Sequence, residues 1–183
     1  AGTGEKNHLV QYVSEYLADH QKQKHILAYD ALTSYHDQGI ITSMDSRTRA
    51  YIKIQEGCNR FCSYCLIPFE RGQVRSRDPQ EIVLEAETLL AHGFRELVLT
   101  GINTALYGTE EAFAYPLTAA EQAAGMHGIE IIISRLNALD GDFRIRLSSL
   151  EPTVVNADYV KRLLQYGKLC PHLHLSIQSG SDA

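Results

Sequence analysis

The chain lacks the features on which membrane-spanning and disulfide-held proteins depend. No apolar run in its 183 residues approaches the roughly 20 that a membrane helix requires. The first residues, Ala1–Lys6, do not show the basic segment followed by an apolar one that marks a signal peptide. There are only four cysteines, and three of them fall in one short segment, which is unlike a disulfide framework. These absences predict a cytoplasmic protein with reduced thiols and no membrane contact.

Positive charge is also scarce. The 17 Lys and Arg residues are outnumbered by 22 Asp and Glu residues, which leaves a net charge of −5. A protein of this charge does not bind nucleic acid over its whole surface, so any contact with a polyanion must be local. The candidates for such a contact are Arg71, Arg75 and Arg77, with Arg47, Arg49 and Arg60 as further members. On charge alone, they are equally well explained as scattered, solvated side chains.

What the chain does contain is a compact set of three cysteines, Cys58, Cys62 and Cys65. Three residues separate the first pair and two separate the second, so one loop can present all three thiolates to a single centre. A structural zinc site closes with four protein ligands, whereas an iron–sulfur cluster held by three thiolates keeps one iron open for a small molecule. The spacing therefore favours a cluster over ordinary buried thiols. Zinc is the competing interpretation, with Cys170, His172 or His174 as a distant fourth ligand.

The hydrophobic pattern predicts helices that alternate with strands. Apolar residues at helical spacing indicate a helix over residues 5–20, and residues 21–48 are expected to form a linker with at most one edge strand. Residues 50–55 alternate as a strand that leads into the cysteine loop. A second helix begins after Asp78, with Pro79 at its first position and Glu81 completing a capping box, and Gly93 ends it. The apolar run at 96–100 then predicts a strand that is parallel to the first.

The same order repeats towards the C-terminus. The pattern predicts a helix over 129–139, a strand over 143–148, a helix over 157–166 that Asn156 caps and Gly167 stops, and a strand over 172–177. About four strands alternating with helices indicate an α/β fold with a parallel sheet, as in an α/β barrel or part of one. Because no helix follows the last strand, the barrel is expected to be truncated at its C-terminus.

Several ordered blocks of sequence resemble the radical S-adenosylmethionine methylthiotransferase family. They are Gly57 to Cys65 with Tyr64 before the third cysteine, Ile54–Asn59, Arg71–Gly72, Ser76–Arg77, Leu99–Asn103, Arg146–Pro152 and His174–Ser181. The resemblance implies a partial radical SAM (β/α) barrel with parallel strands. It also implies that residues 1–48 are the end of an N-terminal methylthiotransferase domain and a linker, and that residues 49–183 form an incomplete radical SAM core domain.

The resemblance also implies the cofactors. Cys58, Cys62 and Cys65 would hold a four-iron, four-sulfur ([4Fe-4S]) cluster whose open iron chelates S-adenosylmethionine. The residues implied near S-adenosylmethionine are Tyr64, Gly101, Ile102, Asn103, Ser149 and Glu151, and those implied for the substrate are Arg71, Arg75 and Arg77. A second, auxiliary [4Fe-4S] cluster is expected in an N-terminal domain that the chain lacks, and the electron is expected from a flavodoxin or a ferredoxin.

Within the family, Arg71–Pro79 and the Leu99–Ile102 turn are most similar to the enzymes that add a methylthio group to C2 of N6-threonylcarbamoyladenosine at position 37 of tRNA. Three alternatives stay open: a methylthiotransferase for isopentenyladenosine in tRNA, one for an aspartate of a ribosomal protein, and a zinc-stabilised RNA-binding module without catalysis. Asn103 departs from the family pattern, where a histidine is expected, and so does Glu70, where a small residue is common. The segment is therefore expected to bind its cofactors without turning over by itself.

Overall fold

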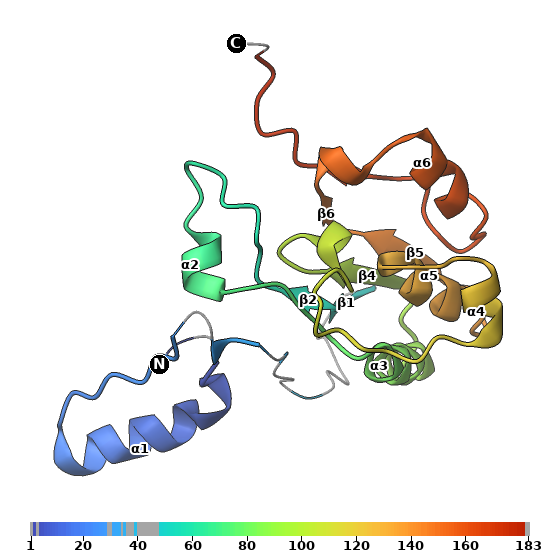
Figure 1. Cartoon of the computed structure of the whole chain (residues 1–183). Coiled ribbons are helices and arrows are strands. Elements are labelled where there is room, and N and C mark those ends of the chain that lie inside the picture. The colour runs from blue at the N-terminus through green and yellow to red at the C-terminus, as the bar shows by residue number, and fades with distance from the viewer. Residues whose placement is uncertain are drawn as a thin grey trace.

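A parallel sheet of three strands lies at the centre of the structure (Figure 1). The computed structural model describes residues 2, 4–28, 31–33, 35, 39 and 48–181. Strand β4 (Glu96–Thr100) lies between β1 (Arg49–Lys53) and β5 (Arg144–Leu147), and both pairings are parallel. The strands predicted at 96–100 and 143–148 and the parallel arrangement are confirmed, whereas the strand predicted over 50–55 is shorter and ends at Lys53.

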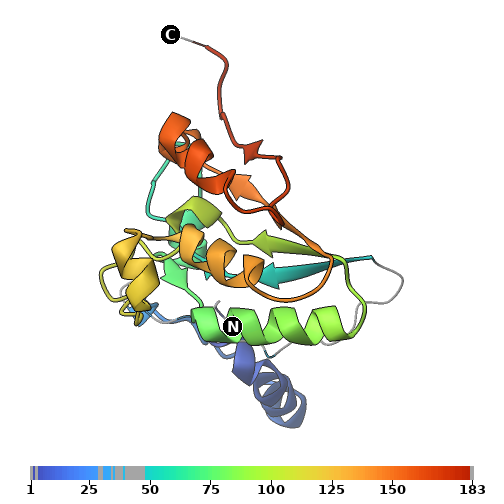
Figure 2. The same cartoon turned by 90° about the vertical axis from the view of Figure 1, so that its right-hand side faces the viewer.

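Two helices cover one face of this sheet (Figure 2). Helix α3 (Pro79–Ala91) packs against β1, helix α5 (Ile129–Asn137) packs against β5, and the two helices contact each other. The core consists mainly of buried aliphatic side chains, and each large one contributes about 1.5–3 kcal/mol when it leaves water. The largest fully buried members are Tyr107, Ile52, Ile54, Ile82, Leu89, Leu97, Leu99, Ile132, Ile133, Leu136, Ile145 and Leu147.

Local signals determine both ends of α3. The Asp78 side chain accepts a hydrogen bond from the Gln80 amide at 2.6 Å, and Pro79 occupies the first turn, as predicted. At the other end Gly93 has a φ of +90°, and the amides of Gly93 and Phe94 bond back to the last turn. This is the Schellman arrangement, which a residue without a Cβ adopts most easily. The capping box predicted with Glu81 is wrong: the Asp78 side chain bonds to Gln80, and the Glu81 carboxylate lies 3.4 Å from Arg77 Nε.

The C-terminal part forms a separate two-stranded sheet with shorter elements. Strand β6 (Ser149–Leu150) follows β5 directly and pairs in parallel with β7 (His174–Leu175). Helix α6 (Ala157–Leu163) connects them, and Asn156 caps it as predicted by accepting a bond from the Tyr159 amide at 2.9 Å. Two predicted lengths are wrong: the helix expected to reach residue 166 ends at Leu163, and the strand expected over 172–177 covers two residues.

The remaining elements connect these layers. Strand β2 (Gln55–Glu56) pairs antiparallel with β3 (Arg75–Ser76), and the cysteine loop and helix α2 (Ile67–Arg71) lie between them. Helix α4 (Ala119–Ala123) precedes α5, and a full capping box between Thr118 and Glu121 starts it. In the part of the chain that the structure describes, short 3₁₀ helices cover Lys6–His8, Thr104–Leu106 and Pro152–Val154.

The N-terminal helix predicted over 5–20 is present as α1 (Leu9–Asp19) after the first 3₁₀ turn. Its apolar side chains Leu9, Val10, Val13 and Leu17 are exposed. Half of the predicted linker lies among residues that the structure does not describe, which include Arg47 and the Ile40–Ile41 segment. Among the described residues, no helix combines the length and the apolar character needed to cross a membrane.

Candidate functional site

The cysteine loop leaves the sheet between β2 and α2, beside the carboxyl end of β1 (Figure 1). Backbone hydrogen bonds shape it: the Cys58 amide donates to the Gly72 carbonyl at 3.1 Å, and the Cys65 amide donates to the Cys62 carbonyl at 2.9 Å. Gly57 precedes the loop with a φ of +76°, and a Cβ there would lie 1.7 Å from the Gln73 carbonyl oxygen. Only glycine fits this close approach of two backbone segments.

The three cysteines line one cavity of about 360 Å³. Their chain neighbour Tyr64 contributes to it, and the opposite wall comes from turns that follow strands β4, β6 and β7. Of the residues implied for S-adenosylmethionine, five therefore line the cavity: Tyr64, Ile102, Asn103, Ser149 and Glu151. Gly101 lies directly before this wall. The cavity falls in the range of about 300–1,000 Å³ that small-molecule sites occupy.

Glu151 joins the two walls of the cavity. Its Oε2 atom accepts from Arg60 Nε of the cysteine loop at 2.6 Å and from Asn103 Nδ2 at 3.1 Å, while its Oε1 atom accepts from Thr153 Oγ1 at 2.6 Å. Partial burial raises the pKa of Glu151, but the hydrogen bonds from Thr153 and Arg60 outweigh this and leave the pKa below its usual value. Glu151 is therefore a carboxylate at neutral pH.

The thiols differ in exposure, since Cys62 is exposed and Cys58 and Cys65 are half-buried. Burial raises the pKa of the Cys58 thiol, and the negative charges of Cys62, Cys65 and Glu151 raise it further, although a backbone hydrogen bond at Arg60 opposes them. A cationic metal centre bound at this wall would offset the repulsion between thiolates and stabilise their charge. Three soft thiolate donors beside an open cavity fit an iron–sulfur cluster.

The zinc interpretation finds no support in the described residues. Of the three residues offered as a fourth ligand, Cys170 and His172 line a different cavity together with residues of α6. The third, His174, lies in β7, where it pairs with Ser149 of β6. In the described parts of the chain, no three or more His, Cys, Asp or Glu side chains form a group that could hold a metal ion. A zinc ion would require sulfur ligands that converge at about 2.3 Å, whereas a four-iron cluster is larger and holds its thiolates farther apart.

Gln55 is a site residue that the sequence did not indicate. Its side chain is fully buried between the cysteine loop and the turn after β4. Nε2 donates to the carbonyls of Glu56 at 2.8 Å and Gly57 at 2.6 Å, and Oε1 accepts from the amides of Ile102 and Asn103, both at 3.1 Å. The available signal was that Gln55 is a polar residue in a strand whose polar and apolar residues alternate. This pattern indicates a solvated face as readily as a buried amide.

A Gly101→Ala variant is expected to lose about 1–3 kcal/mol of unfolding free energy through overpacking. A Cβ at this position would lie 2.8 Å from Gln55 Oε1 and 3.0 Å from the Gln55 carbonyl oxygen, both of which are held in place. Gly167→Ala is the matched control, because a Cβ there meets nothing within 4 Å. Urea unfolding monitored by circular dichroism measures both; equal losses for the two variants would contradict the steric argument.

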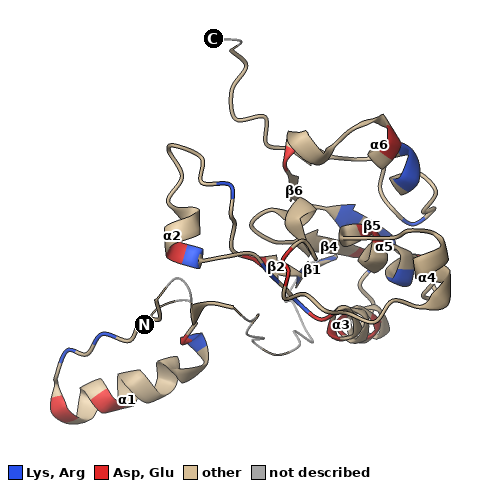
Figure 3. Cartoon of the chain, viewed as in Figure 1, with Lys and Arg blue, Asp and Glu red and all other residues tan. Residues whose placement is uncertain are grey.

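The arginines expected at the substrate lie outside this cavity. The Arg71 side chain is 39% exposed at the end of α2, whereas those of Arg75 and Arg77 are each 3% exposed. Arg77 forms a buried ion pair with Glu85 of α3. Elsewhere, basic and acidic residues occur side by side, as in α2 and α6 (Figure 3). Contact of these three arginines with a substrate stays a prediction.

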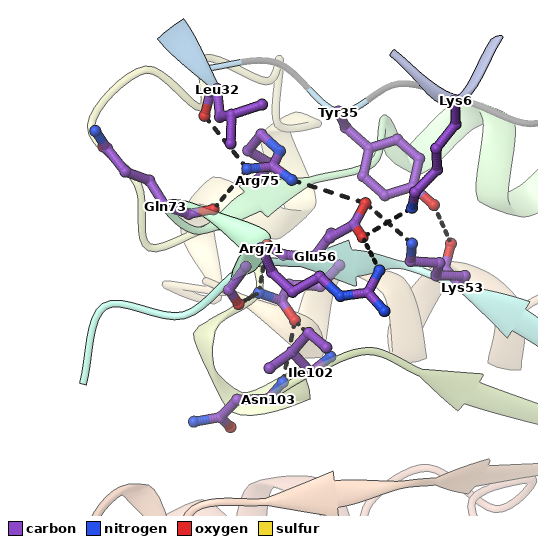
Figure 4. A network of polar contacts seen from close by, with 12 residues as sticks. Lys6, Leu32, Tyr35, Lys53, Glu56, Arg71, Gln73, Arg75, Ile102 and Asn103 are labelled. Carbon is purple, nitrogen blue, oxygen red and sulfur yellow. Dashed lines mark hydrogen bonds and ion pairs between the residues drawn. The ribbon is translucent and has the colours of Figure 1, made fainter. Parts of the chain in front are cut away.

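Glu56, which follows Gln55 in the chain, is the centre of a second polar cluster (Figure 4). Its carboxylate is 3.0 Å from Lys53, 3.1 Å from Lys6 and Arg71, and 3.7 Å from Arg75. One carboxylate thus faces four cationic side chains, and its own side chain is only 6% exposed. These contacts tie the start of the described chain to the base of the cysteine loop.

Comparison with known proteins shows which sequences the chain is similar to. The profile of the radical SAM superfamily matches residues 52–183. The threonylcarbamoyladenosine tRNA methylthiotransferase MtaB of Bacillus subtilis is 34% identical over 99% of this chain and 37% of its own length, and that of Thermotoga maritima is 31% identical over 99% and 38%. The tRNA-2-methylthio-N(6)-dimethylallyladenosine synthase of Caldicellulosiruptor saccharolyticus is 34% identical over 79% and 28%.

A solved structure of the radical S-adenosylmethionine methyltransferase TsrM from Kitasatospora setae covers 68% of this chain and 21% of that protein, at 21% identity and a TM-score of 0.47. The site is of the class in which three thiolates of one loop face a small-molecule cavity at the ends of parallel strands. With the superfamily profile over most of its length, the chain belongs to the radical SAM superfamily. It spans well under half the length of the two MtaB relatives.

Proposed function

We propose that this chain is the core of a longer radical SAM methylthiotransferase that adds a methylthio group to C2 of N6-threonylcarbamoyladenosine at position 37 of tRNA. The observation that carries the proposal is the single cavity lined by the three cysteines, the turn after β4 and Glu151. The similarity to two methylthiotransferases over 99% of the chain supports it.

Cys58, Cys62 and Cys65 are the residues that would hold a [4Fe-4S] cluster. When bound, the cluster supplies one electron and an open iron to which the amino and carboxylate groups of S-adenosylmethionine attach. The chain's contribution is to orient this ligand and to limit its contact with water. Tyr64, from the cysteine loop, and Ile102 and Asn103, from the opposite wall, enclose the cavity from two sides.

Ser149 and Glu151 are proposed to contact the polar groups of S-adenosylmethionine. Glu151 is a carboxylate at neutral pH and already accepts three hydrogen bonds, so it can exchange one of them for a hydroxyl or ammonium donor of the ligand. Gly101 is proposed to permit the close approach of the turn to Gln55, because any Cβ at this position would crowd the Gln55 side chain. Neither Ser149 nor Gly101 has a charged side chain, so their effects on binding are expected to be smaller than that of Glu151.

Arg71 is the best placed of the three arginines to contact a tRNA phosphate or the carboxylate of a threonylcarbamoyl group. Its guanidinium is partly exposed, and arginine binds both anions through paired hydrogen bonds. Arg75 and Arg77 would first have to leave their buried partners. We further propose that a flavodoxin or ferredoxin delivers the electron, and that an auxiliary [4Fe-4S] cluster is held by a domain outside this chain.

The first test is anaerobic reconstitution with iron and sulfide, followed by electron paramagnetic resonance with and without S-adenosylmethionine. A reduced-cluster signal that changes when the ligand is added is expected. Uptake of zinc, or a signal that ignores the ligand, would contradict the proposal.

The substrate is tested separately, with the full-length protein and two tRNA preparations that carry either threonylcarbamoyladenosine or isopentenyladenosine. Mass spectrometry of the digested tRNA is expected to show a methylthio group on the first only. A product on the second only would assign the chain to the activity named for its relative from Caldicellulosiruptor saccharolyticus.

A further inference from the structure

The cysteine loop and the turn after β4 are separate in the sequence, yet one side chain bonds to both. The side-chain amide of Gln55 donates to two backbone carbonyls at the start of the loop and accepts from two backbone amides of the turn. We propose that Gln55 is a positioning residue that sets the spacing between the cysteine loop and the Ile102–Asn103 wall of the cavity. This inference rests on the proposed function of the cavity as the S-adenosylmethionine site.

An amide is the group that these four backbone partners require. Two of them are carbonyl acceptors and two are N–H donors, and a glutamine side chain presents two donors on nitrogen and two acceptor positions on oxygen. The four backbone partners therefore use both donor positions of the side-chain nitrogen and both acceptor positions of the side-chain oxygen. The side chain has no contact with solvent. A carboxylate would offer the carbonyls no hydrogen, and an aliphatic side chain would leave all four groups unpaired.

The contacts of Gln55 also position the polar side chains of the cavity. The Asn103 amide is held by Gln55, and the Asn103 side chain in turn donates to Glu151. Glu151 is bonded to Arg60, which belongs to the cysteine loop. The contacts thus form a closed circuit around the cavity, from the base of the loop through Gln55, Asn103 and Glu151 back to the loop. Figure 4 shows Ile102 and Asn103 next to the Glu56 cluster at the base of this circuit.

The competing explanation is that Gln55 only satisfies buried backbone groups. In that case its replacement lowers stability in the same way as any comparable core change, without a specific effect on ligand binding. The two explanations are separated by variants of similar size: Gln55→Met keeps the length of the side chain without polar atoms, and Gln55→Glu keeps the acceptor without the donors. Ile54→Val is the control, since it removes one methylene from the adjacent, fully buried residue.

The experiment uses anaerobically reconstituted protein and measures the iron content, the thermal unfolding midpoint and the Kd of S-adenosylmethionine by equilibrium dialysis. At equal iron content, both Gln55 variants are expected to raise the Kd of S-adenosylmethionine about tenfold or more. A change of this size is comparable to the loss of one strong contact with the ligand. Ile54→Val is expected to stay within about twofold of the wild type. A Gln55→Met protein that unfolds earlier but binds within about twofold of the wild type would overturn the proposal.

Hydrogen exchange of the apoprotein gives a readout that does not depend on the cluster. In Gln55→Met the amides of Ile102 and Asn103 are expected to exchange at least about tenfold faster than in the wild type, because their acceptor is gone. They are expected to remain protected in Ile54→Val. If the wild type itself fails to bind S-adenosylmethionine, the proposed function fails, and the exchange rates still decide whether Gln55 holds the turn. Unchanged exchange rates of these two amides in Gln55→Met would contradict the proposal that Gln55 holds the turn.

Discussion

A Cys65→Ser protein is expected to retain less than about one iron per chain after reconstitution, where the wild type is expected to hold about four. Serine is a poor ligand for iron in an iron–sulfur cluster, because its hydroxyl does not ionise at neutral pH and its oxygen is a harder ligand than a thiolate sulfur. Cys58 and Cys62 line the same cavity and would remain, but two thiolates leave a second iron without a protein ligand. Iron and sulfide assays together with the visible absorption of the cluster measure the loss.

Cys170→Ala is the matched control for this prediction. Cys170 is buried at 7% exposure and lines a cavity that contains none of the three loop cysteines. Its replacement is expected to cost some stability and leave the iron content at the wild-type level. Equal iron loss in Cys170→Ala and Cys65→Ser would show that the effect follows from general destabilisation, and a Cys65→Ser protein that keeps its iron would remove this residue from the ligand set.

A Glu56→Gln protein is expected to lose about 3 kcal/mol of unfolding free energy, near the lower end for removing one partner of a buried ion pair. Arg75 then keeps its charge at 3% exposure without the Glu56 carboxylate, beside three further cations, and Glu110 is the acidic residue that still acts on it. Lys6, Lys53 and Arg71 reach water and reduce the cost. Glu70→Gln is the control, since this exposed neighbour of Arg71 is expected to change stability by about 0.5 kcal/mol or less.

A second variant tests the cause of this loss. Glu56→Gln combined with Arg75→Met removes the buried cation as well as the carboxylate, and is expected to be more stable than Glu56→Gln alone, because no buried charge is left unpaired. Urea unfolding at neutral pH compares the wild type, Glu56→Gln, Arg75→Met and the double variant. If the double variant is less stable than the single one by the full cost of an independent Arg75 substitution, the loss does not come from the unpaired arginine.

The pH dependence of the Glu56 contribution has a definite sign. Burial raises the pKa of Glu56, but hydrogen bonds and charges from Lys53 and Lys6 lower it more, so the folded pKa lies below the ordinary value. The unfolded chain, with a glutamate pKa near about 4.3, then binds the proton more readily than the folded protein. The contribution is present above this value and is lost as the pH falls through the folded pKa. The difference between wild type and Glu56→Gln is therefore expected to shrink below about pH 4.

Sequence patterns anticipated those parts of the fold that depend on neighbours along the chain. Asp78 and Pro79 start α3, and Gly93 ends it, because capping is decided within one helical turn. The strand predicted over 172–177 was too long, since an alternating pattern does not reveal how many residues find a partner strand. Only His174 and Leu175 pair with β6. The actual end of α6, at Leu163, was likewise not indicated by Gly167 four residues later.

Some residues of the candidate site could likewise be predicted from local sequence, and others could not. The spacing of Cys58, Cys62 and Cys65 is informative without a structure, because a short loop must bring its own ligands together. The arginines could not be placed, because their surroundings depend on which carboxylates they meet. Arg77 meets Glu85 of the next helix, and Arg75 meets Glu56 across β2 and β3. The alternation around Gln55 indicates the polar face of a strand, and only its long-range partners show it to be buried.

Periodicity, caps and ligand spacing are local properties, and they were enough to predict the alternation of helices and strands, the parallel order of the sheet and the three-thiol loop at a strand end. Which distant segments face that loop is a property of the folded chain. Folding brings the turn after β4 and Glu151 to the thiols, and it buries Arg75 and Gln55 against partners far along the chain. Such contacts depend on how the strands stack and on where polar groups find partners away from water, which a linear pattern does not specify.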